Sequence, residues 1–274
     1  MAAVISSQAA SERLLDDPGA FAREFSLAAP DAAMLTDMAG DLALLTSSFV
    51  RKRCTTLRWN AHRTLDLLGP EGDLLVDEFV EATPMSSHFR VDAAAFGDFV
   101  VGRTAAWAAG EPAEGDGAGS ADAAQVIAAM ARFERHRSDS FWDATERFNS
   151  EEASGPAAGD HQDDATRPRF VAGANVGRFE WDVRLPYRHR VDPLDQLPRD
   201  PCQLLFFHSA REPVLRAVRL RPGEGDLVER ALSAGTPAVG MPDIRGTATG
   251  GPPGAGRDEQ LFARLSWEGA VQWE

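Results

Sequence analysis

Residues 203–235 constrain the fold most, because they contain three consecutive elements with clear boundaries. Residues 203–210 form a short apolar run, and residues 214–221 mix arginine with apolar side chains ahead of Pro222 and Gly223. Apolar residues then recur at helical spacing, at Leu227, Val228, Ala231 and Leu232. The pattern predicts a strand, a second strand and a helix. A small sheet with an edge strand beside a helix can accept an extended peptide as an additional strand.

The periodicity of apolar residues divides the chain into a helical part and a mixed part. Before residue 149, apolar side chains recur every three or four residues, as in helices. The helical segments are residues 11–25, 30–68, 73–82, 92–107 and 120–148. We therefore predict an all-helical domain over residues 1–149. Residues 150–172 are polar and acidic and contain glycine and proline, which predicts a linker or a mobile loop.

Residues 173–274 are predicted to form a small α+β domain. Residues 178–185 alternate as a strand does, which makes three strands with the two described above. Residues 258–265 have one apolar side and predict a last helix, and residues 270–273 predict a short terminal strand. The glycine-rich residues 110–119 and 245–256 predict loops. The expected fold class is α+β, with helices first, then three strands, then further helices.

The charge balance narrows the class of partner. The 274 residues carry a formal net charge of −14, which argues against nucleic acid or an anionic membrane as the principal partner. No apolar run approaches the roughly 20 residues that span a bilayer. The first residues lack the basic start and apolar centre of a secretory signal. We expect a cytoplasmic protein, with Cys54 and Cys202 as reduced thiols.

Residue types that carry catalysis or bind metals are present without the spacing that those functions need. None of the six histidines has another histidine four residues away, and no Gly-x-Ser-x-Gly sequence occurs. Residues 251–258 resemble a phosphate-binding loop, but two prolines remove N–H donors there. Glu134 is more simply explained as a contact between helices than as an acid–base group. We expect no catalytic residue, no metal and no cofactor in this chain.

One concentrated basic cluster lies within the second helical segment. Arg51, Lys52 and Arg53 are followed by Arg58 and Arg63 on later turns. A solvated helix face, with long side chains lying over apolar neighbours, explains the cluster most simply. The alternative is a docking surface for an acidic partner, built from Arg51, Arg53 and Arg58 with Trp59 as an aromatic anchor.

Two regions of the chain resemble the partner proteins of multinuclear non-haem iron-dependent oxidative enzymes, which occur in gene clusters for ribosomally made, modified peptides. The helical motifs are Ser48-Phe-Val-Arg-Lys-Arg, Leu65-Asp-Leu-Leu-Gly-Pro, Leu75-Val-Asp-Glu-Phe-Val-Glu-Ala-Thr-Pro84, Phe96-Gly-Asp-Phe-Val and Met130-Ala-Arg-Phe-Glu134. The later motifs are Leu204-Leu-Phe-Phe-His208, Leu232-Ser-Ala-Gly235, Leu261-Phe-Ala-Arg-Leu265 and Gly269-Ala270. The later region is similar to a winged-helix-like peptide-recognition domain, with three strands and then helices.

The resemblance implies a non-catalytic subunit that forms a heterodimer with a separate iron enzyme. The iron would belong to that enzyme, and this chain would bind the leader region of a precursor peptide. The leader would pair with the third strand and pack against the last helix. The implied contacts are Val214, Leu215, Arg216, Ala217, Val218, Arg219, Leu220, Arg221, Leu261, Arg264 and Leu265.

Three arginines of the third strand, Arg216, Arg219 and Arg221, have two interpretations. They pair with acidic leader residues, or they protect an edge strand from aggregation. A proline at Val218 is expected to abolish peptide binding by removing a donor of the strand.

Two other functional classes stay open from the sequence. One is a winged-helix transcriptional regulator, although arginine and acidic residues nearly balance from Cys202 onward and no basic recognition helix stands out. The other is a stand-alone enzyme of a type that no motif identifies.

Overall fold

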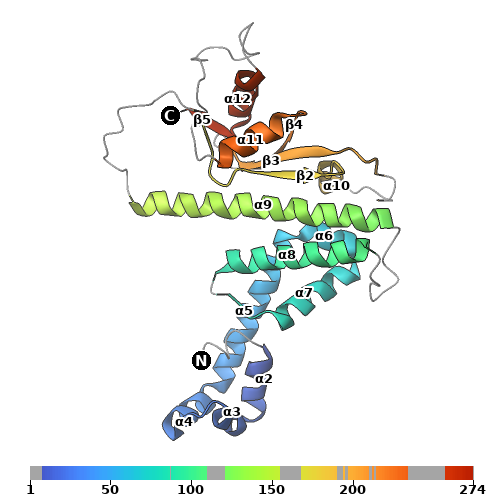
Figure 1. Ribbon diagram of the computed structural model, residues 1–274. Helices are drawn as coiled ribbons and strands as arrows, with labels where there is room; N and C mark the ends of the chain where they lie inside the picture. Colours follow the sequence, from blue (N-terminus) through green and yellow to red (C-terminus); the bar gives the residue numbers. More distant parts are fainter. Residues whose placement is uncertain are drawn as a thin grey trace. The chain divides into compact units, whose positions relative to one another are not determined.

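The computed structural model describes residues 8–86, 88–109, 121–154, 168–189, 194, 197–209, 212, 214–233 and 257–273. The chain forms two compact units, residues 1–118 and residues 119–274 (Figure 1). Among the described residues, no helix has both the length and the apolar character needed to cross a bilayer.

The described residues of the first unit are helical, as the periodicity predicts. The helices are α2 (Gln8–Asp16), α3 (Pro18–Glu24), α4 (Ala29–Asp37), α5 (Ala39–Asn60), α6 (His62–Leu68), α7 (Pro70–Ala82) and α8 (Phe89–Ala108). Their boundaries follow local chemistry. The Asp17 carboxylate accepts a hydrogen bond from the Ala20 N–H at 2.8 Å and caps α3, whose first residue is Pro18. Gly69, with φ of 60°, separates α6 from α7.

Two apolar clusters stabilise the first unit. Near its beginning, α2, α3, α4 and α5 bury Ala10, Leu14, Phe21, Leu35, Ala39 and Leu42. Further along, the rings of Phe79 in α7 and Phe96 in α8 meet edge to face with centroids 5.2 Å apart. Leu57 of α5 is fully buried. The Arg53 guanidinium of α5 lies 5.3 Å from the centre of the Phe79 ring, so the long α5 contacts both clusters.

The second unit is built around a three-stranded antiparallel sheet. Its strands are β2 (Asn175–Phe179), β3 (Cys202–His208) and β4 (Leu215–Leu220), in the order β2-β3-β4. Its helices are α9 (Ala121–Ser154), α10 (Arg184–Arg188), α11 (Glu224–Ser233) and α12 (Arg257–Glu268). A second, two-stranded antiparallel sheet pairs β1 (Pro168–Phe170) with β5 (Val271–Trp273).

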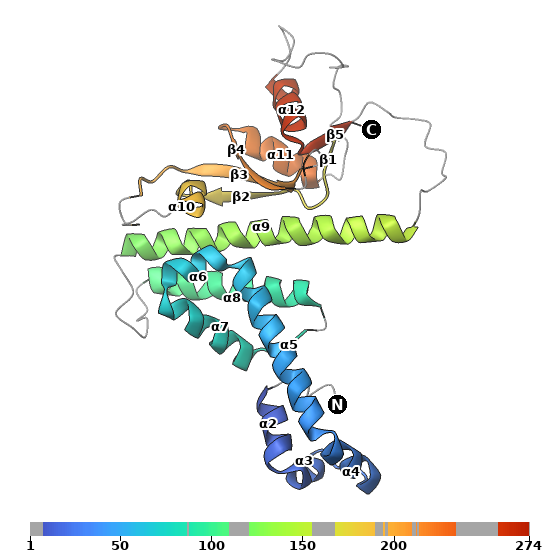
Figure 2. The same cartoon turned by 180° about the vertical axis from the view of Figure 1, so that it is seen from behind.

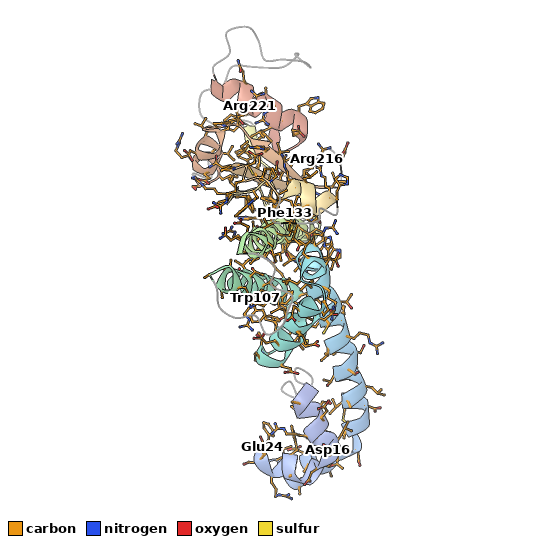
Figure 3. All side chains as sticks on the ribbon, turned by 90° about the vertical axis from the view of Figure 1, so that its right-hand side faces the viewer. Asp16, Glu24, Trp107, Phe133, Arg216 and Arg221 are labelled. Carbon is orange, nitrogen blue, oxygen red and sulfur yellow. The ribbon has the colours of Figure 1, made fainter. Side chains whose placement is uncertain are left out.

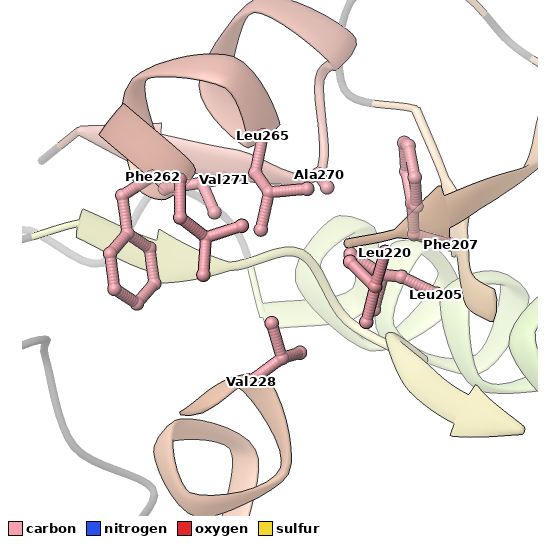
Figure 4. Close-up of a cluster of buried hydrophobic side chains, with 9 residues drawn as sticks. Leu205, Phe207, Leu220, Val228, Phe262, Leu265, Ala270 and Val271 are labelled. Carbon is pink, nitrogen blue, oxygen red and sulfur yellow. The ribbon is translucent and has the colours of Figure 1, made fainter. Parts of the chain in front are cut away.

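Helices cover both faces of the three-stranded sheet (Figure 2). Because side chains alternate along a strand, neighbouring residues of β3 point to opposite faces. The Phe206 ring contacts Phe133 of α9 with centroids 5.1 Å apart, so one face lies on α9. Leu205 and Phe207 point to the other face and join a buried cluster with α11 and α12 (Figure 4). That cluster contains Leu220, Val228, Leu261, Phe262, Leu265, Ala270 and Val271.

The α+β class is confirmed, while two boundaries differ from the prediction. Helix α9 belongs to the compact unit of the sheet, so that unit starts at Gly119, whereas the predicted boundary lies at residue 149. Periodicity shows that a helix is amphipathic but not which surface it covers. Both the end of α9 and strand β1 lie inside the predicted linker, residues 150–172.

The strand predicted at residues 178–185 is mostly wrong. Strand β2 ends at Phe179, and α10 begins at Arg184. Trp181 and Val183 are buried at alternate positions, which produces the strand-like pattern. The Asp182 carboxylate accepts the Arg184 N–H at 3.2 Å, a local bond that turns the chain.

The other elements of this unit agree with the prediction, with shifts of a few residues. They are β3, β4, α11, α12 and the terminal strand β5. The loops predicted at 110–119 and 245–256 lie outside the described residues.

Candidate peptide-binding edge of the sheet

Strand β4 forms one edge of the three-stranded sheet. It pairs only with β3 among the described strands, in a register that runs from Gln203 opposite Leu220 to His208 opposite Leu215. The Ser209 N–H donates to the Val214 carbonyl at 3.0 Å, so these two opposite residues form a hydrogen-bonded pair. Hydrogen-bonded and non-bonded pairs alternate along an antiparallel ladder. The backbone groups of Arg216 and Val218 therefore point to β3, and those of Leu215, Ala217 and Arg219 point outward.

The outward edge ends at a charged cluster beyond Arg219. The Arg219 carbonyl accepts a hydrogen bond from Arg264 Nη1 of α12 at 3.5 Å. The Arg221 N–H donates to Glu224 Oε2 at 2.7 Å, and Arg264 also forms an ion pair with Glu224. An incoming strand can therefore use the backbone from the Leu215 N–H to the Arg219 N–H, because the next groups already have partners.

The arginines of β4 are bound by carboxylates of the same chain. Arg216 donates to Glu212 at 2.7 Å and to Glu268 of α12 at 3.0 Å. Arg219 donates to both oxygens of Asp200, at 2.5 and 2.7 Å, and to Asp182 at 3.4 Å. These two arginines lie on opposite faces of the sheet, since their positions differ by an odd number. Arg216, the second residue of β4, and Arg221, which follows its last residue, are labelled in Figure 3.

These ion pairs shift the acid–base properties of the groups around β4. The hydrogen bond from Arg219 holds the pKa of the exposed Asp200 below its usual value. The hydrogen bond from Arg184 lowers the pKa of Asp182, and Arg219 adds to the effect. Burial, with a smaller contribution from Asp182, raises the pKa of the Cys202 thiol to about 11. At neutral pH the carboxylates are charged and Cys202 is a thiol.

Three residues expected to contact a peptide lie in the core instead. Leu220, Leu261 and Leu265 belong to the buried cluster between the sheet and the helices α11 and α12. The spacing of apolar residues shows that these side chains are buried, but it does not show whether they line the core or a binding groove. Val218 packs against the same cluster and its N–H faces β3, so proline there would disrupt the sheet. The outward donor in this part of the strand is Ala217.

Among the other expected contacts, Leu215, Ala217 and Arg219 turn their backbone groups outward, and the Arg221 N–H donates to Glu224. Val214 is exposed immediately before β4, and Arg264 reaches the end of the outward edge from α12. Two residues of this edge were not predicted from the sequence, Glu224 and Glu268. Glu224 occupies the first turn of a helix after Pro222-Gly223, which is a recognisable capping position. No sequence signal identifies Glu268 as a neighbour of β4.

The basic cluster of α5 does not form one surface. Arg51 and Arg58 are exposed, and Trp59 is 57% exposed. Arg53 is 1% exposed and points inward, so it is removed from the predicted docking surface. Its guanidinium donates to both oxygens of Asp92 in α8, at 2.8 and 3.2 Å, and to the Thr83 carbonyl at 2.9 Å. Arg58 is exposed but forms an ion pair with Asp73.

A metal site is not found within the described ranges, where no group of three or more His, Cys, Asp or Glu side chains is suited to hold an ion. One histidine has a clear structural role. His136 of α9 stacks on Phe206, and its Nδ1 lies 2.7 Å from the Asn175 side-chain oxygen. Burial lowers the pKa of His136, so its imidazole is neutral at neutral pH. It helps to hold β2 and β3 on α9.

Comparison with known proteins adds no family assignment. No protein-family model matches the chain, and no curated protein sequence matches it significantly.

Proposed function

We propose that this chain is a non-catalytic partner subunit that binds the leader region of a ribosomally made precursor peptide by strand addition. It presents the peptide to a multinuclear non-haem iron enzyme, which carries the metal and the oxidative chemistry. The proposal rests on the sequence resemblance together with one structural observation. Strand β4 is an edge strand whose outward backbone groups, at Leu215, Ala217 and Arg219, have α12 beside them.

The extent of the open edge sets the size of the ligand. A strand that pairs from Leu215 to Arg219 uses about five residues of backbone, and its affinity comes from main-chain hydrogen bonds. Selectivity then depends on side chains that flank the edge. On one face these belong to α12, where Arg264 and Glu268 both contact β4.

The transcriptional regulator is less well supported. A winged-helix regulator needs basic side chains on the helix that enters the DNA groove. Helix α11 carries Glu224, Asp226 and Glu229, and the last two bind Arg178 of β2. An acidic helix whose carboxylates hold the sheet is poorly suited to approach phosphates.

The proposal predicts genes for an iron enzyme and for a short precursor peptide beside this gene, and the test is co-expression with their products. Wild-type chain is expected to co-purify with the enzyme and to support modification of the peptide. Ala217→Pro removes the outward N–H without touching the ladder to β3, so it should retain the enzyme and lose peptide modification. Ala217→Ser keeps the N–H and is the matched control.

Two results would contradict the proposal in different ways. Failure of the wild-type chain to form a complex with the enzyme would remove the role of partner subunit. Full modification with a folded Ala217→Pro variant would place the peptide somewhere other than the edge of β4.

A further inference from the structure

We infer that two copies of this chain associate through the exposed face of α5, with the two helices antiparallel about a two-fold axis. The inference does not depend on the proposed function, and it concerns the first compact unit. It follows from two observations on one helix. The helix carries an apolar patch that the unit leaves exposed, and charges of opposite sign lie on either side of that patch.

The apolar patch lies in the first half of α5. Leu44 is 73% exposed, the highest exposed fraction of any large apolar side chain among the described residues, and Leu45 is 49% exposed. Phe49, one turn after Leu45, is also exposed. Leu42 and Thr46 of the same turns are buried, so the opposite side of the helix supplies the core. Single exposed apolar residues are ordinary, but a contiguous group on consecutive turns indicates a contact surface.

The charges on either side of this patch have opposite signs. Asp41 lies one turn before Leu44, and Arg51 and Lys52 lie two turns after it, all three exposed. Among the described residues, neither Asp41 nor Arg51 has an ion-pair partner, and the Lys52 ammonium lies 4.8 Å from the centre of the Phe89 ring. Positions 41, 44, 48 and 51 are three or four residues apart and share one side of the helix. This face is therefore acidic at one end and basic at the other.

Such a face is complementary to itself when the two helices run in opposite directions. With the two-fold axis between Leu44 and Ser48, each Asp41 lies opposite Arg51 and Lys52 of the other copy. Each Leu44 then lies opposite a serine, which is small enough to let the helices approach, and the leucine is removed from water. The two charged contacts are identical by symmetry. A parallel pair would instead place like charges together. A second copy therefore supplies both charges in the required order.

The length of the overlap sets the strength of the dimer. With this axis, residues 39–53 of the two copies face each other, which is about 15 residues and roughly 22 Å of helix. An interface of this length is smaller than those of permanent complexes. We therefore expect a dissociation constant on the order of micromolar.

Sedimentation equilibrium of the full chain, from about 1 to 200 µM, tests the inference, with circular dichroism to check that each variant is folded. Asp41→Lys makes the acidic end of the face basic. Arg51→Glu combined with Lys52→Glu makes the basic end acidic. Each of these two variants alone brings like charges together in both contacts, so its dimer dissociation constant should rise about tenfold or more.

Mixing the two charge variants provides the decisive measurement. In a heterodimer of the two, both contacts again join opposite charges. An equimolar mixture should therefore form dimers with about the affinity of the wild type. A loss of stability within each single chain could not be recovered by mixing.

The apolar patch has its own variant and control. Leu44→Glu places a charge opposite Ser48 and should raise the dimer dissociation constant about tenfold or more. Leu74→Glu is the matched control, because Leu74 is an exposed leucine of α7, outside the proposed contact. It should leave the dissociation constant unchanged.

Four results would overturn the inference. A wild-type chain that stays monomeric over the whole concentration range would remove the dimer. Dimers that mixing of the charge variants does not restore would refute the antiparallel contact. Dimers that dissociate with Ala217→Pro but not with Leu44→Glu would place the second copy at the edge of β4. A monomeric chain whose co-purification with an iron enzyme is lost with Leu44→Glu would assign this face to that enzyme.

Discussion

The buried ion pair between Arg53 and Asp92 offers the sharpest test of how the first unit is held together. It joins α5 to α8, and the two side chains are 1% and 3% exposed. Arg53 Nε donates to one Asp92 oxygen at 2.8 Å and Nη2 donates to the other at 3.2 Å. The Ser86 N–H also donates to the Asp92 carboxylate, at 3.2 Å. Asp92→Ala removes these acceptors and leaves a cation in the interior.

The expected loss of stability is large, because the remaining charge has no counter-ion. Breaking a buried pair by removing one partner costs about 3–5 kcal/mol. The carbonyls of Thr83 and Val80 still accept bonds from Arg53, at 2.9 and 3.5 Å, but they cannot neutralise it. Arg53→Met combined with Asp92→Leu should be more stable than Asp92→Ala alone. The double variant loses more hydrogen bonds, but it leaves no uncompensated charge.

Urea denaturation followed by circular dichroism measures the effect, and hydrogen exchange of α5 and α8 amides assigns the transition to the first unit. Asp73→Ala is the control, because it breaks the exposed pair between Arg58 and Asp73 in the same helical region. That change should cost less than about 1 kcal/mol. If Asp92→Ala costs no more than Asp73→Ala at an unchanged denaturant slope, the pair does not anchor α5 on α8.

Three further predictions concern the second unit. Burial raises the pKa of Cys202 to about 11, so at pH 7 only about one thiol in ten thousand is ionised. Cys202 should therefore resist alkylation by iodoacetamide until the chain is unfolded. Rapid labelling of Cys202 in the folded protein would contradict this. Burial lowers the pKa of His136, so the folded state favours the neutral imidazole: its stabilising contribution is complete above the unfolded pKa near 6.5 and is lost as the pH falls from there through the lower folded value. The midpoint of thermal denaturation should depend less on pH in His136→Gln than in the wild type between about pH 7.5 and 4.5. Equal dependence on pH in the two proteins would refute this role of His136. The lowered pKa values of Asp182 and Asp200 affect stability in a more acidic range. Gly173→Ala should destabilise the protein by about 1–3 kcal/mol in urea denaturation, since Gly173 has φ of 71° and an added Cβ would lie 2.6 Å from the Ser140 carbonyl oxygen. Gly40→Ala in α5 is the control. Its added Cβ meets nothing within 4 Å, so this change should be neutral or stabilising.

Part of the candidate site follows from the sequence alone. The turn at Pro222-Gly223 and the Glu224–Ser233 helix are local features, so β4 and α11 are predicted nearly at their observed bounds. In the first unit the helical segments are predicted, but residues 30–68 form three helices, α4, α5 and α6, instead of one continuous segment. Gly69 and Pro70 mark the break between α6 and α7. Local chemistry is sufficient there, because capping, turn geometry and periodicity act within a few residues.

Only the tertiary structure shows which residues far apart in the chain form ion pairs with each other. From the sequence, Arg51 and Arg53 are both predicted to lie on an exposed helix face. Arg53 is nevertheless buried, because it forms an ion pair with Asp92, thirty-nine positions later. Arg216 and Arg219 look available for a ligand until Glu268 and Asp200 are brought beside them. The sequence determined most of the helices and strands, though not β1 or α10, since their formation depends largely on neighbouring residues. The fold decided which charges are neutralised and which apolar side chains stay in water, since burial depends on packing between distant segments.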